Sequence, residues 1–444
     1  MHKGFSLSAF LISSPRRSFH PSERKNRAAS FAADFLVVLV GILSPFSIKI
    51  VGNLPIGEVI VIMCLPVLLV VRGRRLFGGG RTKLYILLAL WLLSQIITDL
   101  YRGTERADWM RGQATIVFFA LDLLFMTVLA QENAFRKVVF FIAFSVGSIL
   151  AIQYQPTEYM ASYPWKFGYS FPVTLLFLLF ASFLYKFRIY LAVLILIGIP
   201  IFLDLLFNYR SPVLFLLVTT VLTLPLIPER FGRVRVLPRQ GSASRVAVLA
   251  ALAIGAGAVS LILLQVATAA GIAGEEAQQK NEQQFESGHG ILLGARPELL
   301  VSWQAVRDSP ILGHGSWAKD PKYIEMLFDI TRRNGITMDL EDIEQDSRGL
   351  IPAHSHLMGA WVNAGIAGGI FWAYIFWITL KAAIKVSNRH PSLAPLYVWL
   401  LTSLLWAIIF SPFGSTVRIT EAATIVIIID ELKDDEKSVK RSKL

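Results

Sequence analysis

LYILLALWLLSQIITDL at residues 84–100 and ATIVFFALDLLFMTVLA at residues 114–130 are two apolar runs separated by the charged segment YRGTERADWMRGQ. Each run approaches the length of roughly 20 apolar residues that a helix needs to cross the hydrocarbon layer of a bilayer. Apolar runs separated by short charged segments are typical of proteins whose helices cross a membrane several times. This pair therefore predicts two membrane-spanning helices joined by a short polar loop.

Similar runs extend in both directions from this pair and predict an all-α, polytopic integral membrane protein with about twelve transmembrane helices. They lie near residues 31–48, 54–71, 84–100, 114–130, 138–153, 169–185, 189–207, 212–227, 246–270, 355–380, 393–410 and 417–431, the last being short. The composition excludes a soluble globular protein, because 54% of the residues are apolar, 17% are charged and the mean hydropathy is +0.56. Cys64 is the only cysteine, which excludes disulfide frameworks and cysteine-based zinc sites.

The lysines and arginines predict how these helices are oriented. When the N-terminus is placed in the cytoplasm, 28 of the 43 Lys and Arg residues fall in cytoplasmic segments. Eight of the others lie in the long stretch 271–353, which leaves seven in the short outer loops. The positive-inside rule therefore predicts that both termini are cytoplasmic and that residues 271–353 lie outside. This rule also explains the net charge of +12, so nucleic acid is not expected as a partner.

The predicted topology divides the chain into five parts. They are a cytoplasmic arm (1–30), a bundle of nine spans (31–270), an outer loop (271–353), three further spans (354–431) and a cytoplasmic tail (432–444). Within the outer loop, apolar residues recur at helical spacing around Trp303 and around Met326, which predicts two amphipathic helices. Pro310 and the turn Gly313–Gly315 are expected to separate these helices.

His354 and His356 lie where the tenth span begins, on the outer side, so each can face water while the helix below holds it. A histidine there can act as a general base, since an ordinary pKa near 6.5 leaves a neutral fraction at neutral pH. The alternative for each is a structural role at the membrane interface. Residues two positions apart on a helix point in directions about 200° apart, so the two histidines are not expected to share one role.

Arg210 lies in the short outer turn FNYRSP between the seventh and eighth spans, and Arg296 lies at the head of the first predicted loop helix. A guanidinium at either place can bind phosphate oxygens in a bidentate manner, and a helix N-terminus adds its own attraction for an anion. The alternative for both arginines is an anchor at the membrane interface. His314, in the Gly313–Gly315 turn, lies on the same outer face, and we assign it with Arg210, Arg296 and His356 to substrate binding.

The sequence does not predict a metal site. The outer face carries several carboxylates and four histidines, namely His289, His314, His354 and His356. No HExxH or DxD spacing brings ligands of this kind together.

Glu105 and Asp108, in the loop RGTERADWM, are an alternative catalytic base or metal ligand, and they can equally be solvated partners of nearby arginines. Asp122, the one acid deep inside an apolar run, is expected to be neutral or hydrogen-bonded to a neighbouring helix.

A series of spaced residues links the outer loop to the tenth span. The series is Gly294-Ala295-Arg296, Trp303, Pro310, Gly313-His314-Gly315, and His354 followed by Gly365 and Gly368. With Arg210 at the outer turn ahead of the loop, it resembles the bacterial O-antigen ligase and polysaccharide polymerase family, and within it the exopolysaccharide or capsule polymerases. Two positions depart from the family's pattern. Ala295 interrupts the Gly-Arg pair, and Ser355 stands where asparagine is usual.

The resemblance implies transfer of a glycan from an undecaprenyl-diphosphate carrier to the hydroxyl of an acceptor sugar, at the periplasmic face of the bacterial inner membrane. It implies an enzyme that needs no metal or other cofactor, with His354 as the base and Arg210 and Arg296 stabilising the departing diphosphate. Gly313, Gly315, Gly365 and Gly368 would be structural, letting backbones approach closely. The partners implied are the lipid-linked donor, a glycan acceptor, the lipid bilayer and a chain-length regulator protein.

Two other functions stay open at the level of the sequence. A transporter or flippase would move a lipid-linked sugar without chemistry, and it predicts repeat symmetry and polar groups at mid-membrane depth. The sequence has little of either feature. A single-sugar membrane glycosyltransferase would use Glu105 or Asp108 instead of His354.

Overall fold

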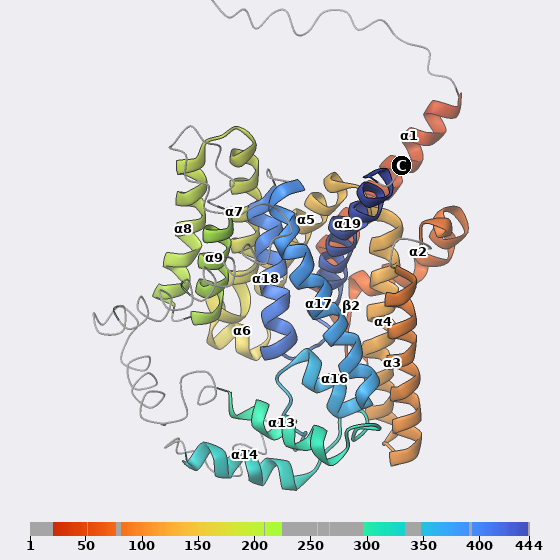
Figure 1. Ribbon diagram of the computed structural model, residues 1–444, viewed down its shortest axis with the longest axis vertical. Helices are drawn as coiled ribbons and strands as arrows, with labels where there is room; N and C mark the ends of the chain where they lie inside the picture. The colour runs from red at the N-terminus through yellow and green to blue at the C-terminus, as the bar shows by residue number, and fades with distance from the viewer. Residues whose placement is uncertain are drawn as a thin grey trace, which may run out of the picture.

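Figure 1 presents the computed structural model of the chain, which describes residues 21–50, 52–76, 81–207, 209–223, 296–333, 348–389 and 393–442 together with the single positions 255 and 266. The described part is almost entirely helical. Apart from those two positions, the predicted ninth span (246–270) lies outside the described residues, as does the stretch of the outer loop before residue 296.

The first half of the described chain contains α1 (Pro21–Leu43), β1 (Ser47–Lys49), β2 (Asn53–Pro55), α2 (Ile56–Arg72), η2 (Gly73–Leu76), α3 (Arg81–Arg102), α4 (Arg106–Ala130), α5 (Ala134–Tyr154), α6 (Glu158–Ser162), η3 (Trp165–Tyr169), α7 (Ser170–Lys186), α8 (Tyr190–Leu206) and α9 (Arg210–Thr223). The second half contains α13 (Pro297–Asp308), α14 (Pro321–Arg333), α16 (His356–Ala364), α17 (Ile366–Arg389), α18 (Ala394–Phe410) and α19 (Arg418–Ser442). The strands β1 and β2 form a small antiparallel hairpin in which Ser47 lies opposite Pro55. The Gln155 side chain binds both backbone polar groups of Ser47, at 3.0 Å and 2.8 Å.

Five helical stretches among the described residues are long and apolar enough to cross a membrane. They are α3, α4, α5, the stretch Trp165–Lys186 and the stretch Ile366–Ala383 at the start of α17. Four shorter apolar helices accompany them: Ala29–Leu43, Tyr190–Leu206, Ser211–Thr223 and Ala394–Phe410. The prediction of an all-α membrane protein is confirmed at this level, whereas the count of twelve spans stays a prediction.

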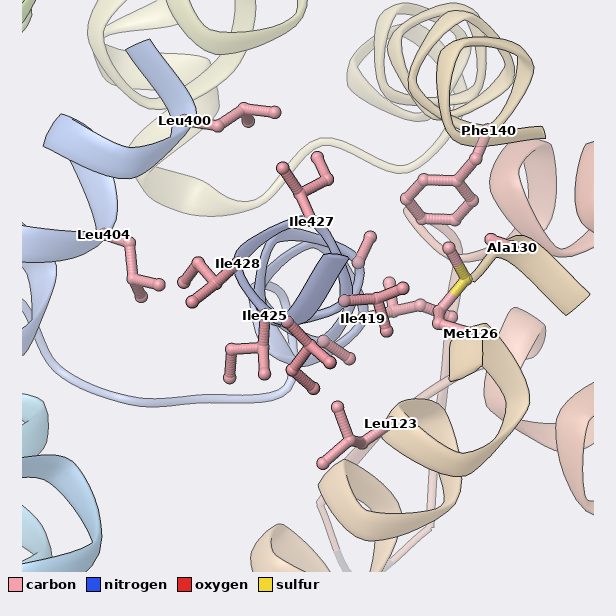
Figure 2. Packing of buried hydrophobic residues seen from close by; sticks show 14 of the residues in the cluster. Leu123, Met126, Ala130, Phe140, Leu400, Leu404, Ile419, Ile425, Ile427 and Ile428 are labelled. Carbon is pink, nitrogen blue, oxygen red and sulfur yellow. The ribbon is translucent and has the colours of Figure 1, made fainter. Parts of the chain in front are cut away.

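Helix α19 lies inside the bundle, where α4, α17 and α18 contact it and Phe140 of α5 lies nearby (Figure 2). Its residues from Arg418 to Ile429 are all buried, and from Ala422 to Ile429 every side chain except Thr424 is apolar. A helix that is apolar all round belongs in a protein interior, because no face of it favours water. The last apolar run, which the sequence presents as a short final span, is thus the core of a helix of 25 residues.

Helices α13 and α14 cover the end of the bundle opposite to the N-terminal end of α1 and the C-terminal end of α19 (Figure 1). They occupy the two stretches of the outer loop in which helical spacing is predicted. Pro297 is the first residue of α13, a position where its missing N–H leaves no helical bond unmade. Val301, Ala305 and Tyr323 form a second apolar cluster with Val362 of α16, which attaches this cap to the bundle.

Candidate functional site

His354 precedes Ser355, the N-cap residue of helix α16, and the His354 side chain is exposed. The Ser355 hydroxyl accepts a hydrogen bond from the Met358 N–H at 3.1 Å and donates one to the Ile408 carbonyl of α18 at 2.8 Å. Serine is a favoured N-cap residue because its oxygen satisfies a helix N–H that has no partner. The backbone beside His354 is therefore held to two helices, while the imidazole reaches water.

Backbone hydrogen bonds join the turn 311–315 to the end of α16. The His314 N–H donates to the Val362 carbonyl at 2.7 Å, and the Gly315 N–H donates to the Asn363 carbonyl at 3.1 Å. In return, the Ile366 N–H donates to the Ile311 carbonyl at 3.2 Å. These backbone bonds join the outer loop to the helix that His354 precedes, so the two parts of the predicted site form one rigid junction.

Glycines are required where this junction is tightest. Gly365 has a φ of +69° and Gly313 a φ of +77°, values that side chains on L residues rarely permit. A Cβ on Gly313 would lie 2.6 Å from the Gly365 nitrogen, and a Cβ on Gly365 would overlap the Ile311 carbonyl. Gly368 similarly faces the Ala360 carbonyl, and Gly315 faces the Thr104 hydroxyl. The four glycines assigned a structural role thus lie at close backbone or side-chain approaches around the end of α16.

Asp99, near the end of α3, is a buried carboxylate that sequence reasoning missed. It accepts hydrogen bonds from the Ser316 N–H at 2.6 Å and the Ser316 hydroxyl at 2.7 Å. Thr104 and Gln113 donate to it at 3.0 Å and 2.9 Å. Asp99 therefore joins α3 to the loop that contains Ser316. Its signal in the sequence was weak, since one acid at the end of an apolar run resembles an ordinary helix end.

Arg102, one turn after Asp99 on α3, also binds the loop that follows α13. Its Nε and Nη2 donate to the Gly313 carbonyl at 3.1 Å and 2.7 Å, and Nη2 also donates to the Ser309 hydroxyl at 2.7 Å.

Glu105 and Asp108, the two acids considered as an alternative catalytic base, make no contact of this kind with the described part of the outer loop around Gly313. Asp108 pairs with Arg111 at 2.9 Å and with Lys319 at 3.8 Å, as a partner of nearby basic residues. Glu105 precedes α4 without a side-chain bond to its N-terminus.

His356 lies inside the bundle. Its Nδ1 is 2.7 Å from the Ser411 carbonyl, so this nitrogen carries the proton and donates. Its Nε2 is 2.6 Å from Oε1 of Glu421 on α19. The ring also packs against Trp372 and Phe413 at centroid distances of 4.8 Å and 5.2 Å. For a ring nitrogen of His356 to bind substrate, as predicted, it would have to give up its contact with the Ser411 carbonyl or with Glu421.

His314 lies half-buried within the cap. Its Nε2 is 2.8 Å from the Ala305 carbonyl of α13, and its ring meets the edge of Tyr323 on α14 at a centroid distance of 5.5 Å. The side chain therefore connects the two cap helices, while its backbone forms part of the junction with α16. His354 is accordingly the histidine among these three whose side chain is exposed.

Arg296 is the residue immediately before α13, and its charge influences Tyr209, which precedes α9. Burial raises the pKa of Tyr209 to about 12, the Asp204 carboxylate adds to this rise, and the Arg296 guanidinium opposes it. The Arg296 guanidinium at the head of α13 thus acts electrostatically on Tyr209, the residue before Arg210. Arg210 is the first residue of α9, and its side chain lies outside the described part of the structure.

A buried ion pair lies deeper in the bundle. Arg418, at the start of α19, donates to both oxygens of Glu58 on α2, at 2.7 Å and 2.6 Å. The carboxyl of Asp122 on α4 lies beside this pair and is fully buried. Asp122 is therefore next to a charged pair on two neighbouring helices, although neither of its oxygens has a hydrogen bond of standard geometry.

Among the described residues, no group of three or more His, Cys, Asp or Glu side chains is arranged to hold a metal ion. His289, which the sequence places on the same face, lies outside those residues. Comparison with known protein families and with curated proteins finds no match to the chain.

Proposed function

We propose that this protein transfers a glycan from an undecaprenyl-diphosphate carrier to the hydroxyl of an acceptor sugar, at the periplasmic face of the bacterial inner membrane. The observation that carries the proposal is the placement of His354. Its imidazole is exposed, and Ser355 and the glycine junction hold the backbone that follows it, at the end of a bundle of apolar helices. A fixed base at a membrane surface suits a reaction between a lipid-linked donor and a water-soluble hydroxyl.

In the proposed reaction, the acceptor oxygen attacks the anomeric carbon of the donor glycan. The bond between that carbon and the diphosphate oxygen breaks, and undecaprenyl diphosphate leaves with the electron pair. The neutral imidazole of His354 takes the proton of the attacking hydroxyl and passes it to water. Arg296 and Arg210 bind the diphosphate, where positive charge stabilises the growing negative charge of the leaving group. Cofactors are not part of this proposal.

The proposal includes the predicted topology of about twelve spans with both termini in the cytoplasm. Short connections support it, since three residues between α3 and α4, and three between α4 and α5, require these helices to run antiparallel. The cap of α13 and α14 lies opposite to the ends of α1 and α19 nearest the termini (Figure 1), in agreement with a periplasmic cap and cytoplasmic termini. The proposed partners are the donor and acceptor glycans, the bilayer and a chain-length regulator.

The test is the substitution His354→Ala in the full chain, followed by electrophoresis of the polysaccharide that cells produce. We expect loss of long chains, with a fall in rate of about 100-fold or more, because general-base catalysis contributes about that factor. His390→Ala is the matched control, since His390 lies in a connection predicted to be cytoplasmic. Unchanged chain length in a correctly inserted His354→Ala protein would rule out the base.

Arg296→Ala and Arg210→Ala test the diphosphate assignment separately. Each is expected to weaken donor binding and catalysis together, while Lys at either position restores part of the activity because it keeps the charge and loses the bidentate geometry. Single repeat units should then accumulate on the carrier outside the membrane. Accumulation on the inner side instead would favour the transporter over the enzyme.

A further inference from the structure

Trp317 presents a large aromatic side chain on the outer cap from a strained backbone position. It lies in the connection between α13 and α14, its φ is +53°, and the residue is 36% exposed. A left-handed conformation is uncommon for a bulky residue and costs conformational energy. Among the described residues, neither apolar cluster includes Trp317. Core packing therefore does not account for the strain, and an exposed indole held in this way points to a binding function.

The backbone on both sides of Trp317 is held in place. On one side, Ser316 donates its N–H and its hydroxyl to Asp99 of α3, at 2.6 Å and 2.7 Å. On the other side, the Ala318 carbonyl accepts a hydrogen bond from the Ile351 N–H at 2.9 Å. The segment that carries the indole is therefore ordered before a ligand arrives, which lowers the entropic cost of binding.

Charged side chains lie beside the indole. The Arg111 guanidinium of α4 lies over the Trp317 ring, 5.3 Å from its centroid, within the range of cation–π attraction. Arg111 pairs with Asp108 at 2.9 Å, and Lys319 reaches the same carboxylate at 3.8 Å. The Lys319 side chain is 56% exposed. An aromatic ring, a carboxylate and two cationic groups thus lie together at the outer end of α4.

This combination of groups suits a sugar ring. One face of a pyranose presents C–H groups whose partial positive charge is attracted to the negative face of an aromatic ring. The hydroxyls at its edge can donate hydrogen bonds to a carboxylate and accept them from an ammonium or a guanidinium group. A purely apolar ligand would make no use of these polar groups, and a small ion would make no use of the indole.

Trp317 is attached to the segment that leads to the proposed base, His354. The hydrogen bond between Ala318 and Ile351 belongs to a short antiparallel contact between the two segments. Three residues then lead from Ile351 to His354, at most about 11 Å of extended backbone. Arg296, a proposed ligand of the diphosphate, lies at the other end of α13, a helix of 12 residues. A sugar on the indole is thus linked to the base and removed from the leaving group, as an acceptor must be.

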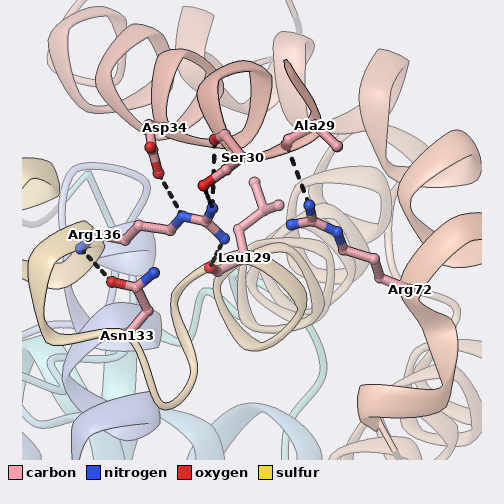
Figure 3. Close-up of polar contacts among 7 residues, drawn as sticks. All are labelled: Ala29, Ser30, Asp34, Arg72, Leu129, Asn133 and Arg136. Atoms are coloured by element: carbon pink, nitrogen blue, oxygen red, sulfur yellow. Dashed lines mark hydrogen bonds and ion pairs between the residues drawn. The ribbon is translucent and has the colours of Figure 1, made fainter. Parts of the chain in front are cut away.

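A charged cluster at the opposite end of the bundle only joins helices, and it differs from the Trp317 site (Figure 3). There the Arg136 guanidinium donates to the Asp34 carboxylate at 2.6 Å and to the Leu129 carbonyl at 2.9 Å. The Arg136 side chain is 6% exposed, so these protein groups enclose it. At the outer end of α4, by contrast, the indole and the Lys319 ammonium remain accessible to a ligand.

We propose that the Trp317 site binds a sugar ring of the acceptor glycan. The ring stacks on the indole, and Asp108 and Lys319 form hydrogen bonds with its hydroxyls, while the attacking hydroxyl of the same glycan reaches His354. Assignment of the sugar to the acceptor rests on the proposed glycan transfer. Trp317 positions the acceptor and takes no part in proton transfer, so its loss should raise KM for the acceptor and leave kcat nearly unchanged.

The test first measures binding by the purified full chain in nanodiscs. The probe is a set of oligosaccharides released by mild acid from the polysaccharide that the cells produce. Without donor no transfer takes place, so isothermal titration calorimetry reports binding alone. We expect Trp317→Ala to bind the probe about tenfold more weakly. Trp377→Ala is the matched control and should bind like wild type, because Trp377 is an exposed indole under the Lys381 ammonium of α17.

Transfer supplies the second measurement, with donor extracted from cells that lack the protein. Trp317→Ala should raise KM for the oligosaccharides about tenfold, and Trp317→Tyr should restore most of the affinity because it keeps an aromatic face. Equal binding by the wild type and by a folded Trp317→Ala protein would overturn the site, and so would a fall in kcat at unchanged KM. Neither result touches the transfer reaction, which His354→Ala tests separately. Binding that depends on Trp317 without any transfer would keep the sugar site and end the proposed reaction.

Discussion

Gly365 ends α16 with φ +69° and ψ −158°, a combination that is almost confined to glycine. The chain needs this turn because α17 starts at the next residue and the Ile311 carbonyl lies directly against the Gly365 Cα. One residue thus fixes three things: the end of the helix that follows His354, the start of the next helix, and the contact with the outer loop.

Gly365→Ala should therefore destabilise the cap strongly. We expect a loss of about 3 kcal/mol or more in the free energy of unfolding, because backbone strain and overlap with Ile311 add together. Gly349→Ala is the control, since Gly349 has a φ of +68° and nothing within 4 Å of its would-be Cβ. It should cost only the backbone strain, about 1 kcal/mol. Thermal unfolding in detergent measures both, and equal losses would show that the contact with Ile311 is unimportant.

The sequence predicted some features of the candidate site and missed the contacts between residues far apart in the chain. The spacing of His354, Gly365 and Gly368 was noted through the family resemblance, and the structure places both glycines where a Cβ would meet backbone atoms. The partner of His356 was not predictable, since Glu421 lies 65 positions away and only the folded bundle brings it to Nε2. Asp99 was missed for the same reason: its main donor, Ser316, is 217 positions away.

At the level of elements, the cap depends on a link between α13 and α14. Asp308, the last residue of α13, accepts hydrogen bonds from Lys322 at 2.6 Å and Tyr323 at 2.8 Å. These bonds, first that from Lys322 and then that from Tyr323, lower the pKa of Asp308 to about 2. The charged carboxylate is thus the form that holds the two helices together.

The link predicts a pH dependence with a definite sign. A carboxyl whose pKa is lowered on folding stabilises the fold above its unfolded pKa of about 3.9, and the contribution disappears as the pH falls towards about 2. Wild type should unfold at a higher temperature than Asp308→Asn at neutral pH, by an amount worth less than about 1 kcal/mol because the pair is exposed. The difference should vanish below about pH 2. Asp329→Asn, on the exposed face of α14, serves as control, and a gap that persists in acid would contradict the assignment.

Elements with a strong periodic signal were predictable, and short ones were not. The recurrence of apolar residues around Trp303 and Met326 indicates α13 and α14, since a helix buries one face at that spacing. The five-residue helix α6 and the π-helical turn η3 that follows it carry too few residues for any period to be visible. They were therefore absent from the prediction, which passes directly from the fifth span to the sixth.

At the level of the whole molecule, the Glu58–Arg418 pair ties the beginning of the bundle to its central helix across 360 positions. Arg418→Leu should cost about 3–5 kcal/mol, because it leaves a buried carboxyl without its partner and next to Asp122. Glu58→Leu/Arg418→Leu should cost clearly less, since the pair is removed together with its desolvation penalty. Unfolding temperatures of the two single variants and the double variant supply the comparison. Strict additivity of the two single losses would mean that the pair is not coupled.

The central position of α19 has a consequence for how the protein is made. The ribosome completes α19 only after every helix that surrounds it in Figure 2 has been synthesised. Until then, the newly inserted helices enclose an unfilled space lined by side chains such as Leu123, Phe140 and Leu404. Lipid tails or loosely packed neighbours must fill that space for a time, and arrival of α19 displaces them. The core of this bundle is therefore expected to pack only once α19 is made, and a nascent chain stopped before residue 418 should be a preferred substrate for membrane proteases.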